Sequence, residues 1–297
     1  MRVAAPGKLV IAGAYAVLEG APALVVAVNR RAYAFDGPGE STTEVRAALA
    51  KPPAVDVSEL QHEGTKLGLG SSAAALVAAI ALRAALRGGD LASESTRRAI
   101  FARAREVHAE VQGGGSGVDV AASTYGGVLR YTTAGGAERV ELPRGVRFVA
   151  FFSGTSARTS DLRARVDALR ARDARTFAAR IAALADVARA AEKSVQVPAP
   201  RAFVDAIAAS GPALDALGHA ADAPIVPAEF GKLGEIARAE NAAFVPSGAG
   251  GGDVGVFVGT AAPSSSFKKS AAAAGMRALA LEIDSAGVRV ETIRKTA

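Results

Sequence analysis

A glycine-rich turn that leads directly into an apolar helical pattern constrains this chain more than any other feature. Residues 65–75 read Thr-Lys-Leu-Gly-Leu-Gly-Ser-Ser-Ala-Ala-Ala, and apolar residues continue after them at helical spacing. Gly68 and Gly70 permit positive φ, so the backbone can approach a ligand closely. Ser71 and Ser72 fall at the expected start of the helix, where free N–H groups and the positive end of the helix dipole favour an anion.

The turn differs from the common P-loop. That motif places lysine immediately before its serine or threonine, whereas Ser71 follows Gly70 and the nearest lysine is Lys66. A serine at the start of a helix also serves as an ordinary N-cap, which only has to satisfy the first free N–H groups. The turn alone therefore leaves two interpretations, a phosphate site and a plain helix cap.

Composition narrows the classes of function. The 297 residues are enough for two domains or one large domain, and their formal net charge of +6 suits nucleic acid or a polyanionic small ligand. No basic cluster with interleaved aromatic residues is present, so we do not expect nucleic acid as a partner. The chain has no cysteine, which excludes disulfides, zinc thiolate sites and thiol catalysis.

The first residues superficially resemble a secretory signal peptide, because Arg2 and Lys8 precede an apolar stretch and a small-residue triplet at Ala14 to Ala16. The apolar stretch is shorter than the roughly 7–15 residues of such a peptide. No apolar run approaches the roughly 20 residues of a membrane-spanning helix. We therefore expect a cytoplasmic protein that does not act on a membrane.

Hydrophobic spacing and turn signals predict the elements of the first half. Alternating runs bounded by glycine and proline predict strands, and apolar residues at three- and four-residue steps predict helices. The expected strands are 8–12, 24–28, 31–35, 127–131, 140–142 and 146–152, with short strands and loops over 36–64. The expected helices run from the glycine turn to about residue 87, and from residue 93 or 95 to 112.

Helical spacing dominates after residue 152. One apolar stripe is formed by Leu162, Val166, Leu169, Phe177, Ile181 and Leu184. Arginines between Arg158 and Arg180 mostly fall off this stripe, which predicts a helical hairpin with a solvated face. Further helices are expected at 203–217, 228–243 and 268–274, and strands at 254–258, 279–283 and 288–292.

This order of elements predicts an α+β fold. We place a domain boundary near Phe152. The N-terminal domain, residues 1–152, is expected to mix strands and helices. The C-terminal domain, residues 153–297, is expected to pack helices on a small antiparallel sheet.

Three further glycine-containing segments carry polar residues in unusual places. Residues 6–17 set Lys8 at the start of an apolar strand, where a lone lysine more often protects a strand edge. In residues 112–127, Asp119 follows a glycine-rich turn and is the only charged residue of the segment. An isolated aspartate in such a place is normally a helix cap. Residues 246–253 read Pro-Ser-Gly-Ala-Gly-Gly-Gly-Asp, which alone is typical of a flexible hairpin or linker.

Together the four segments occur in the order and spacing of one family. The chain resembles the GHMP small-molecule kinases, named for galactokinase, homoserine kinase, mevalonate kinase and phosphomevalonate kinase. Residues 6–17, 68–74 and 247–253 resemble the first, second and third motifs of that family. Within it the similarity to phosphomevalonate kinases is greatest, in residues 6–17, 108–123 and 153–159. The resemblance implies a two-domain α+β kinase fold that uses ATP and Mg²⁺.

Carried over position by position, the resemblance implies a role for each matching residue. The ATP triphosphate is expected at Lys66, Gly68, Leu69, Gly70, Ser71, Ser72 and Ala73, with Ser72 also a magnesium ligand. Asp119 matches the catalytic base of mevalonate kinases, and Lys8 matches the lysine paired with it. The acceptor is expected to contact Tyr15, Ser116, Gly117, Ser156, Arg158, Thr159, Ser247, Gly248 and Gly250.

Two positions depart from the family pattern. The first motif usually has glutamate after its glycine, where this chain has Ala14. Mevalonate kinases place a magnesium-binding glutamate where this chain has His108, and histidine is a poor ligand for Mg²⁺, which prefers oxygen.

We expect ATP-dependent phosphorylation of phosphomevalonate to diphosphomevalonate, a step of isoprenoid biosynthesis. A mevalonate kinase or another GHMP kinase is the first alternative. A degenerate scaffold that binds nucleotide or metabolite without turnover is the second, suggested by Ala14 and His108. In each case the expected partner is a small anionic molecule, and the expected assembly is a monomer or homodimer.

Overall fold

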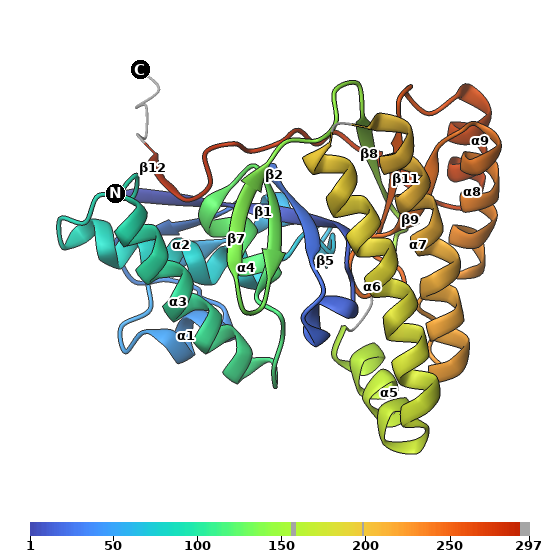
Figure 1. Ribbon diagram of the computed structural model, residues 1–297. Helices are drawn as coiled ribbons and strands as arrows, with labels where there is room; N and C mark the ends of the chain where they lie inside the picture. Colours follow the sequence, from blue (N-terminus) through green and yellow to red (C-terminus); the bar gives the residue numbers. More distant parts are fainter. Residues whose placement is uncertain (156–158, 198, 292–297) are drawn as a thin grey trace. The chain divides into compact units, whose positions relative to one another are not determined.

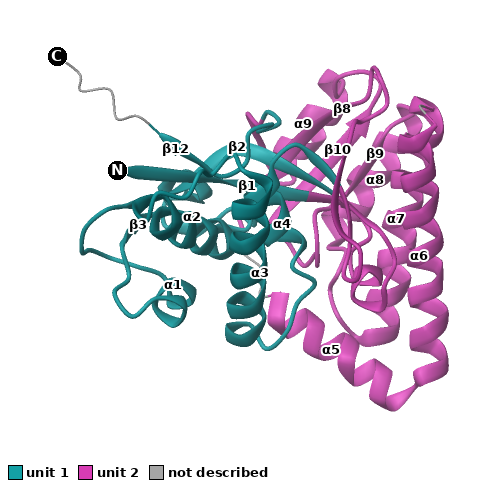
Figure 2. Ribbon diagram, turned by 60° about the vertical axis from the view of Figure 1, so that its left-hand side comes forward, with its two compact units in different colours: residues 1–9, 25–129, 282–297 teal, residues 10–24, 130–281 magenta. Residues whose placement is uncertain are grey.

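The computed structural model describes residues 1–155, 159–197 and 199–291. Contacts divide the chain into two compact units, each assembled from separate stretches of sequence (Figure 2). Unit 1 comprises Met1–Leu9, Val25–Leu129 and Glu282–Ala297, and unit 2 comprises Val10–Leu24 and Arg130–Leu281. The expected boundary near Phe152 would divide the chain at a single point, whereas each unit is built from separate stretches of sequence. The division into domains at residue 152 stays a prediction.

Unit 1 contains a sheet with the strand order β12-β1-β2-β6. These strands are β1 (Arg2–Ala12), β2 (Ala23–Phe35), β6 (Val128–Thr132) and β12 (Arg289–Glu291). A further strand, β3 (Ala54–Asp56), pairs antiparallel with β2. β12 pairs antiparallel with β1, in a register that sets Arg2 opposite Glu291. Strands β1, β2 and β6 each continue from one unit into the other.

A group of helices packs together in unit 1 (Figure 1). They are α1 (Thr43–Ala48), α2 (Ser71–Leu86), α3 (Glu94–Val111) and α4 (Val118–Tyr125). The second of them, α2, contacts the other three and also strands β3 and β12. Most of its residues are buried, because its many alanines let neighbouring elements approach closely. Between β3 and α2 lie the 3₁₀ helix Ser58–Leu60 and the short paired strands β4 (Gln61–His62) and β5 (Thr65–Lys66).

Several elements of unit 1 correct the expectations from sequence. The two strands expected at 24–28 and 31–35 are one strand, β2. Residues 36–64 contain α1, which begins where the Thr42 side chain accepts a hydrogen bond from the N–H of Val45 (3.4 Å). The stretch around Asp119 forms α4. Both helices are too short for apolar residues to repeat at helical spacing, so hydrophobic periodicity does not reveal them.

Unit 2 contains an antiparallel sheet with the strand order β11-β8-β10-β9. These strands are β8 (Arg147–Phe152), β9 (Ala243–Pro246), β10 (Val254–Gly259) and β11 (Arg277–Leu279), and β7 (Gly136–Val140) follows β6. Helices α8 (Ala228–Ala239) and α9 (Ser265–Ala273) share a core with this sheet. Phenylalanines dominate that core, and the rings of Phe257 and Phe267 lie 4.9 Å apart in an edge arrangement. The helix expected to reach residue 243 ends at Ala239, because β9 takes the following residues into the sheet.

The arginine-rich stretch of unit 2 forms the expected helical hairpin. Helices α5 (Thr159–Arg172) and α6 (Ala174–Gln196) are joined at Asp173, whose side chain accepts a hydrogen bond from the N–H of Thr176 (2.9 Å). The apolar stripe of the hairpin is buried against α7 (Pro200–Ala221), the 3₁₀ helix Ala16–Glu19 and nearby residues. Arginines such as Arg165 and Arg180 are exposed, so the hairpin has a solvated face as its spacing predicts.

Both units combine helices with antiparallel strand pairs, which confirms the expected α+β class. The expected packing of C-terminal helices on a small antiparallel sheet is found in unit 2. Within the described ranges, no helix is both long enough and apolar enough to cross a membrane.

A buried carboxylate fastens the C-terminal stretch of unit 1 to its sheet. Asp284 is 4% exposed, and it accepts hydrogen bonds from Nε of Arg31 (2.8 Å) and Nη1 of Arg289 (3.1 Å). Its backbone N–H donates to Ala27, and its carbonyl oxygen accepts from Gly127. Burial alone would raise the pKa of Asp284, but the guanidinium groups of Arg289 and Arg31 outweigh burial and hold the pKa below its usual value.

We predict that Asp284→Ala lowers the free energy of unfolding by about 3 kcal/mol near neutral pH, because two partly buried arginines lose their carboxylate. The exposed Asp36 of the same unit supplies the control: Asp36→Ala is expected to cost less than about 0.5 kcal/mol. Urea unfolding of the two variants and the wild type measures both effects. Equal unfolding midpoints for the two variants would contradict a structural role of Asp284.

The same variant has a predicted pH dependence. The folded-state pKa of Asp284 lies below its unfolded-state value, which is about 4. The stabilisation is therefore complete above the unfolded-state pKa and is lost as the pH falls through the folded-state pKa. The difference in stability between wild type and Asp284→Ala should shrink between about pH 5 and pH 2, and a constant difference would show that the charge of Asp284 is not responsible.

Candidate active site

In unit 1, the backbone of β1 lies against the glycine turn. The N–H of Lys8 donates to the carbonyl oxygen of Leu69 at 2.9 Å. Gly7 makes this approach possible, because a Cβ at residue 7 would come within 2.7 Å of that same oxygen. The strand and the turn are thereby held together, and Lys8 is placed beside the turn.

The turn ends at the N-terminus of α2. Gly68 and Gly70 have φ of 70° and 77°, which glycine adopts without strain. The side chains of Leu69 and Ala73 are buried, so these residues can face a ligand only through their backbone. The first N–H groups of α2, at residues 71–73, point out of the helix end, where the helix dipole favours an anion.

Lys8 and Asp119 converge on Gly70. A Cβ added at residue 70 would lie 3.1 Å from Cγ and 3.2 Å from Cε of Lys8, and 3.7 Å from Cβ of Asp119. The Nζ of Lys8 donates to the carbonyl oxygen of Gly68 at 3.1 Å. The structure thus brings the expected lysine and aspartate to one spot beside the turn, and the absence of a side chain at Gly70 leaves them room there.

Helix α4 carries Asp119 and is tied to the strand that carries Lys8. The helix begins after Gly117, whose φ is 81°. The Oδ1 of Asp119 accepts a hydrogen bond from the next backbone N–H at 2.9 Å. One turn later, the buried hydroxyl of Ser123 donates to the carbonyl oxygen of Pro6 at 2.7 Å. Because Pro6 lies two residues before Lys8 on β1, this hydrogen bond fixes helix and strand to each other.

His108 of α3 brings a second basic side chain to Asp119. Its Nε2 lies 3.7 Å from Oδ2 of Asp119, and both side chains are largely buried. This separation is too long for a hydrogen bond, but the two groups attract each other when the histidine is protonated. His108 therefore places an imidazole nitrogen near Asp119, at the position where an oxygen ligand for a metal was expected from the family pattern.

Two other expected site residues of unit 1 lie on β5 and in the turn before α4. Lys66 is exposed on β5, where it lies opposite Gln61 of β4. The hydroxyl oxygen of Ser116 accepts a hydrogen bond from the N–H of Val118 at 3.3 Å, in the turn before α4. Direct ligand contacts of Lys66 and Ser116 stay predictions.

A buried carboxylate that no sequence pattern singles out lies next to the turn. Glu44, in the first turn of α1, is 5% exposed, and its carboxylate accepts a hydrogen bond from Nε2 of Gln112 at 2.7 Å. The available signal was Thr42 followed closely by Glu44, a combination typical of a helix start. Residues 36–64 show no apolar helical spacing, so hydrophobic periodicity does not predict a helix there.

The oxygen atoms around the turn fit a magnesium ion that arrives with a nucleotide. Within the described residues there is no group of three or more His, Asp or Glu side chains that could hold a metal by itself. Mg²⁺ needs no such group, because it commonly binds one or two protein oxygens together with substrate phosphates. The hydroxyl of Ser72 and the carboxylates of Asp119 and Glu44 are oxygen donors of the required kind.

The third glycine segment, residues 247–253, is a packed loop of unit 2. The buried hydroxyl oxygen of Ser247 accepts a hydrogen bond from the N–H of Val10 at 3.0 Å. Gly248 and Gly250 have φ of 79° and 78°, and a Cβ at Gly250 would come within 2.0 Å of the carbonyl oxygen of Ile225. Its composition is typical of a flexible linker, but these contacts give the loop a defined backbone.

Tyr15 joins the first glycine segment to this loop within unit 2. Its φ of 62° is uncommon for a residue with a side chain, and its hydroxyl donates to the carbonyl oxygen of Ala249 at 2.7 Å. Burial raises the pKa of Tyr15, which keeps the hydroxyl protonated. The observed role of this hydroxyl is to bind the loop, and a contact between Tyr15 and the acceptor stays a prediction.

The remaining expected acceptor residues come from the segment before α5. Thr159 is the exposed first residue of that helix. Ser156 and Arg158 lie outside the described residues. The part played by all three in binding stays a prediction.

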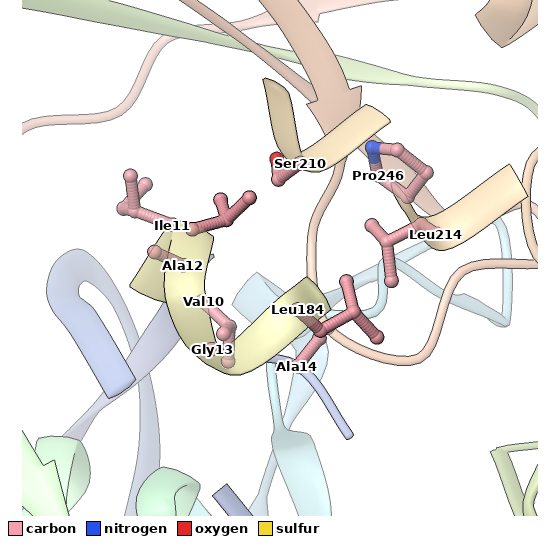
Figure 3. Close-up of a pocket in the computed structure, with 11 residues that line it drawn as sticks. Val10, Ile11, Ala12, Gly13, Ala14, Leu184, Ser210, Leu214 and Pro246 are labelled. Atoms are coloured by element: carbon pink, nitrogen blue, oxygen red, sulfur yellow. The ribbon is translucent and has the colours of Figure 1, made fainter. Parts of the chain in front are cut away.

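Ala14 lines a small apolar cavity in unit 2 (Figure 3). The cavity has a volume of about 10 Å³, and Leu184, Leu214 and Pro246 also line it. This is room for roughly one water molecule. A glutamate at residue 14 would bring its carboxylate toward apolar side chains, which is unfavourable without a partner. Alanine at residue 14, where the family pattern has glutamate, therefore suits the apolar side chains around it.

Comparison with known proteins finds a family match in the part of the chain that carries the turn. Residues 52–127 match the family model of the GHMP kinases N terminal domain. This range includes the glycine turn, helix α2 and Asp119. The match thus covers the turn and Asp119, whereas Lys8 on β1 lies outside the matched range.

Two curated relatives and one solved structure extend the comparison. A phosphomevalonate kinase from Streptomyces sp. (strain CL190) is 26% identical, over 85% of this chain and 88% of that protein. A mevalonate kinase from Archaeoglobus fulgidus is 31% identical, over 58% of this chain and 65% of that protein. The Streptococcus pneumoniae phosphomevalonate kinase in complex with phosphomevalonate and AMPPNP has a TM-score of 0.78 at 19% identity, and 96% of this chain and 100% of that chain are covered. This likeness confirms the expected fold.

We predict that Gly70→Ala destabilises the protein more than Gly64→Ala does. Both glycines have nearly the same positive φ, 77° and 78°, so each substitution carries the left-handed backbone cost of about 1–2 kcal/mol. Only at Gly70 does the added methyl group meet the Lys8 side chain, whereas nothing lies within 4 Å of a Cβ at Gly64. Urea unfolding of both variants measures the difference, and equal losses of stability would show that the space above Gly70 is not filled by Lys8 and Asp119.

Proposed function

We propose that this chain, a small-molecule kinase of the GHMP family, transfers the terminal phosphoryl group of ATP to phosphomevalonate and forms diphosphomevalonate. The observation that carries the proposal is the convergence of Lys8 and Asp119 on Gly70, at the anion-binding end of α2. Phosphoryl transfer asks a protein mainly to position the reactants and to neutralise charge. A glycine turn with free N–H groups, a lysine and nearby oxygen donors meet that demand.

Each residue of the group has a distinct part in this proposal. The N–H groups of residues 71–73 bind the triphosphate, and the Ser72 hydroxyl donates an oxygen to Mg²⁺. A magnesium ion held there would neutralise charge on the phosphates of ATP. Lys8, held over the turn through Gly68, offsets negative charge that develops on the transferred group. Asp119 orients the ammonium group of Lys8 and accepts a proton from an acceptor that still carries one.

The choice of phosphomevalonate is supported by how much of the chain each similarity covers. The similarity to the Streptomyces phosphomevalonate kinase extends over 85% of this chain, whereas that to the Archaeoglobus mevalonate kinase extends over 58%. The net charge of +6 suits an acceptor that bears both a carboxylate and a phosphate. The finer assignment of residues 15, 116–117, 156–159 and 247–250 to this acceptor is part of the same proposal.

Mevalonate phosphorylation is the second candidate, and Asp119 is the observation that favours it. A hydroxyl acceptor keeps its proton at neutral pH, so it benefits from a positioned carboxylate base. Asp119 and Lys8 both lie close to Gly70, as we expect if Asp119 is such a base and Lys8 its partner. The higher identity of the mevalonate kinase match, 31%, is consistent with this candidate.

A direct assay separates these candidates. Purified protein is supplied with MgATP and with phosphomevalonate, mevalonate or a panel of sugars, and both ADP formation and the phosphorylated product are measured. We expect kcat/KM for phosphomevalonate to exceed that for mevalonate by at least about a hundredfold, a difference of about 3 kcal/mol in transition-state binding. Turnover of mevalonate alone would replace the first candidate by the second. Binding of ATP without turnover of any acceptor would instead favour a degenerate scaffold.

We predict that Asp119→Asn affects the two reactions differently. The second pKa of a phosphate monoester is about 6, so near pH 8 phosphomevalonate is already the dianion and has no proton to lose. Its turnover should fall modestly near pH 8 and more steeply near pH 5.5, where part of it must be deprotonated. Mevalonate turnover should fall by roughly 10²–10⁴-fold at every pH, because its hydroxyl always needs a base.

The pH profiles of wild type and Asp119→Asn on both substrates test this difference. Exposed Asp90, in the turn before α3, offers a control that removes the same charge away from Gly70. Asp90→Asn should leave both profiles unchanged. A loss with phosphomevalonate that is large and independent of pH would show that Asp119 acts by orienting Lys8 rather than by accepting a proton.

A further inference from the structure

A cavity lies between helices α7 and α8 and strand β9, within unit 2. Its volume is about 230 Å³, which approaches the roughly 300–1,000 Å³ of typical small-molecule sites. Both helices contact β9, and the three elements lie close together in Figures 1 and 2. Residues of all three elements, and residues 226–227 before α8, line the cavity. The proposed chemistry uses none of them.

Strand β9 is the edge of its sheet, and its free side faces this cavity. Within the described residues, the sheet has no strand beyond β9. The N–H of Ser247 donates to the carbonyl oxygen of Val254 at 2.9 Å, so every second residue counted back from Ser247 is hydrogen-bonded to β10. Phe244 falls between them and directs its N–H and C=O away from β10. A Cβ at Gly234, which lines the cavity, would lie 3.2 Å from that carbonyl oxygen.

The two helices cover opposite faces of the sheet at β9. Successive side chains of a strand point to opposite faces, so Phe244 and Val245 lie on different sides. A Cβ at Gly211 of α7 would lie 3.6 Å from Cγ1 of Val245. On the other side, the ring of Phe244 has its centroid 5.4 Å from that of Phe230 in α8. The cavity therefore runs along the free edge of β9, between the two helices.

The cavity is lined by buried backbone groups that need a hydrogen-bond partner. Phe244 is 3% exposed, and in the described ranges neither its N–H nor its C=O has a partner outside the sheet. Such orphaned groups are rare, because each costs about as much as a lost hydrogen bond. Pro212, inside α7, has no N–H, so the carbonyl of Ala208 lacks its helical donor. The nearby hydroxyl of Ser210 donates to Ile207 instead, at 2.6 Å.

These groups define the hydrogen-bonding pattern of a ligand. The N–H and C=O of one residue at a strand edge point the same way, so Phe244 requires an acceptor and a donor side by side. An amino group next to a ring nitrogen supplies both, and its second N–H is left for another acceptor such as the carbonyl of Ala208. The rings of Phe230, Phe244, Pro212 and Pro227 line the cavity, and flat aromatic ligands pack well on such walls.

The charged side chains at the cavity favour an uncharged ligand. Asp215, Glu235 and Arg238 line it, and Nε2 of His219 lies 3.3 Å from Oδ2 of Asp215. Even with this histidine protonated, the four groups carry no net positive charge. A phosphate group would therefore gain no net attraction here, which argues against a nucleotide or a phosphorylated metabolite as the occupant.

We propose that this cavity is a ligand site for an uncharged, amino-substituted nucleobase. The ring nitrogen of the base accepts a hydrogen bond from the N–H of Phe244, and the amino group donates to the carbonyl oxygen of the same residue. The ligand thereby satisfies the groups that β9 leaves unpaired. The inference does not rest on the proposed kinase activity, because the cavity lies in unit 2 and shares no residue with the glycine turn.

The test is an NMR titration of the full-length, ¹⁵N-labelled protein with cytosine and with adenine, followed at the backbone amide of Phe244. We expect both probes to shift this signal in a saturable way. The matched probe N6,N6-dimethyladenine keeps the flat ring but has no amino N–H. It should bind at least about tenfold more weakly than adenine, because it leaves the carbonyl oxygens unpaired. No shift with cytosine or adenine, as expected if water alone fills the cavity, or equal affinities for adenine and its dimethyl form, would overturn the inference.

A variant that fills the cavity locates the binding. Gly231 is an exposed residue of α8 that lines the cavity, and nothing lies within 4 Å of a Cβ there. Gly231→Leu should fold, because leucine also favours a helix more than glycine does, and it should lose the binding of both probes. The control Ala182→Leu adds a leucine to an exposed position of α6 and should bind them as the wild type does. Unchanged binding in Gly231→Leu would place the probes elsewhere, for example at the glycine turn, and would overturn the inference.

Discussion

The hydrogen bond from the N–H of Lys8 to the carbonyl oxygen of Leu69 is the contact on which the geometry of the candidate site depends. It belongs to a set made by three consecutive residues of β1. Pro6 accepts a hydrogen bond from Ser123 and so holds the helix of Asp119, Gly7 lets the turn approach, and Lys8 reaches over the turn. A shift of one residue in this strand would turn each of these groups to the opposite side of the sheet. The positions of these groups are therefore fixed by the backbone of β1, which is hydrogen-bonded to neighbouring strands on both sides.

The parts of this site that could be predicted from sequence are those with a strong local cause. Gly68, Gly70 and the serines that follow them indicate a turn and a helix start by backbone conformation alone, and α2 begins at Ser71 as expected. Glu44 could not be found in this way. Its carboxylate accepts a hydrogen bond from Gln112, and this contact forms only after α1 and α3 have packed together, so no short-range sequence pattern predicts it. For the same reason the pairing of β1 with β12 cannot be predicted from sequence, since hydrophobic alternation identifies strands but not their partners.

The glycine loop of unit 2 shows how local composition can mislead. Residues 247–253 are nearly all small, and small residues reduce the cost of any conformation, so composition alone is typical of a flexible segment. In the folded chain these small residues also allow close packing. Gly250 lies against the carbonyl oxygen of Ile225, where no side chain would fit. Tyr15 adds a buried hydrogen bond to this loop and adopts an uncommon backbone conformation to make it. Strain held in place by surrounding contacts is characteristic of functional segments.

The way Asp284 and β12 complete unit 1 has a consequence for the order in which the protein is made. A ribosome releases the chain from its N-terminus, so β1 and β2 emerge long before residues 282–291, which contribute the neighbouring strand and the carboxylate for Arg31. Unit 2 is synthesised almost entirely in between. The first strands must therefore wait with one edge unpaired and one arginine without its partner until synthesis is nearly finished. Exposed strand edges of this kind promote association between chains, so the interval before the last residues emerge is when the newborn protein most needs protection by chaperones.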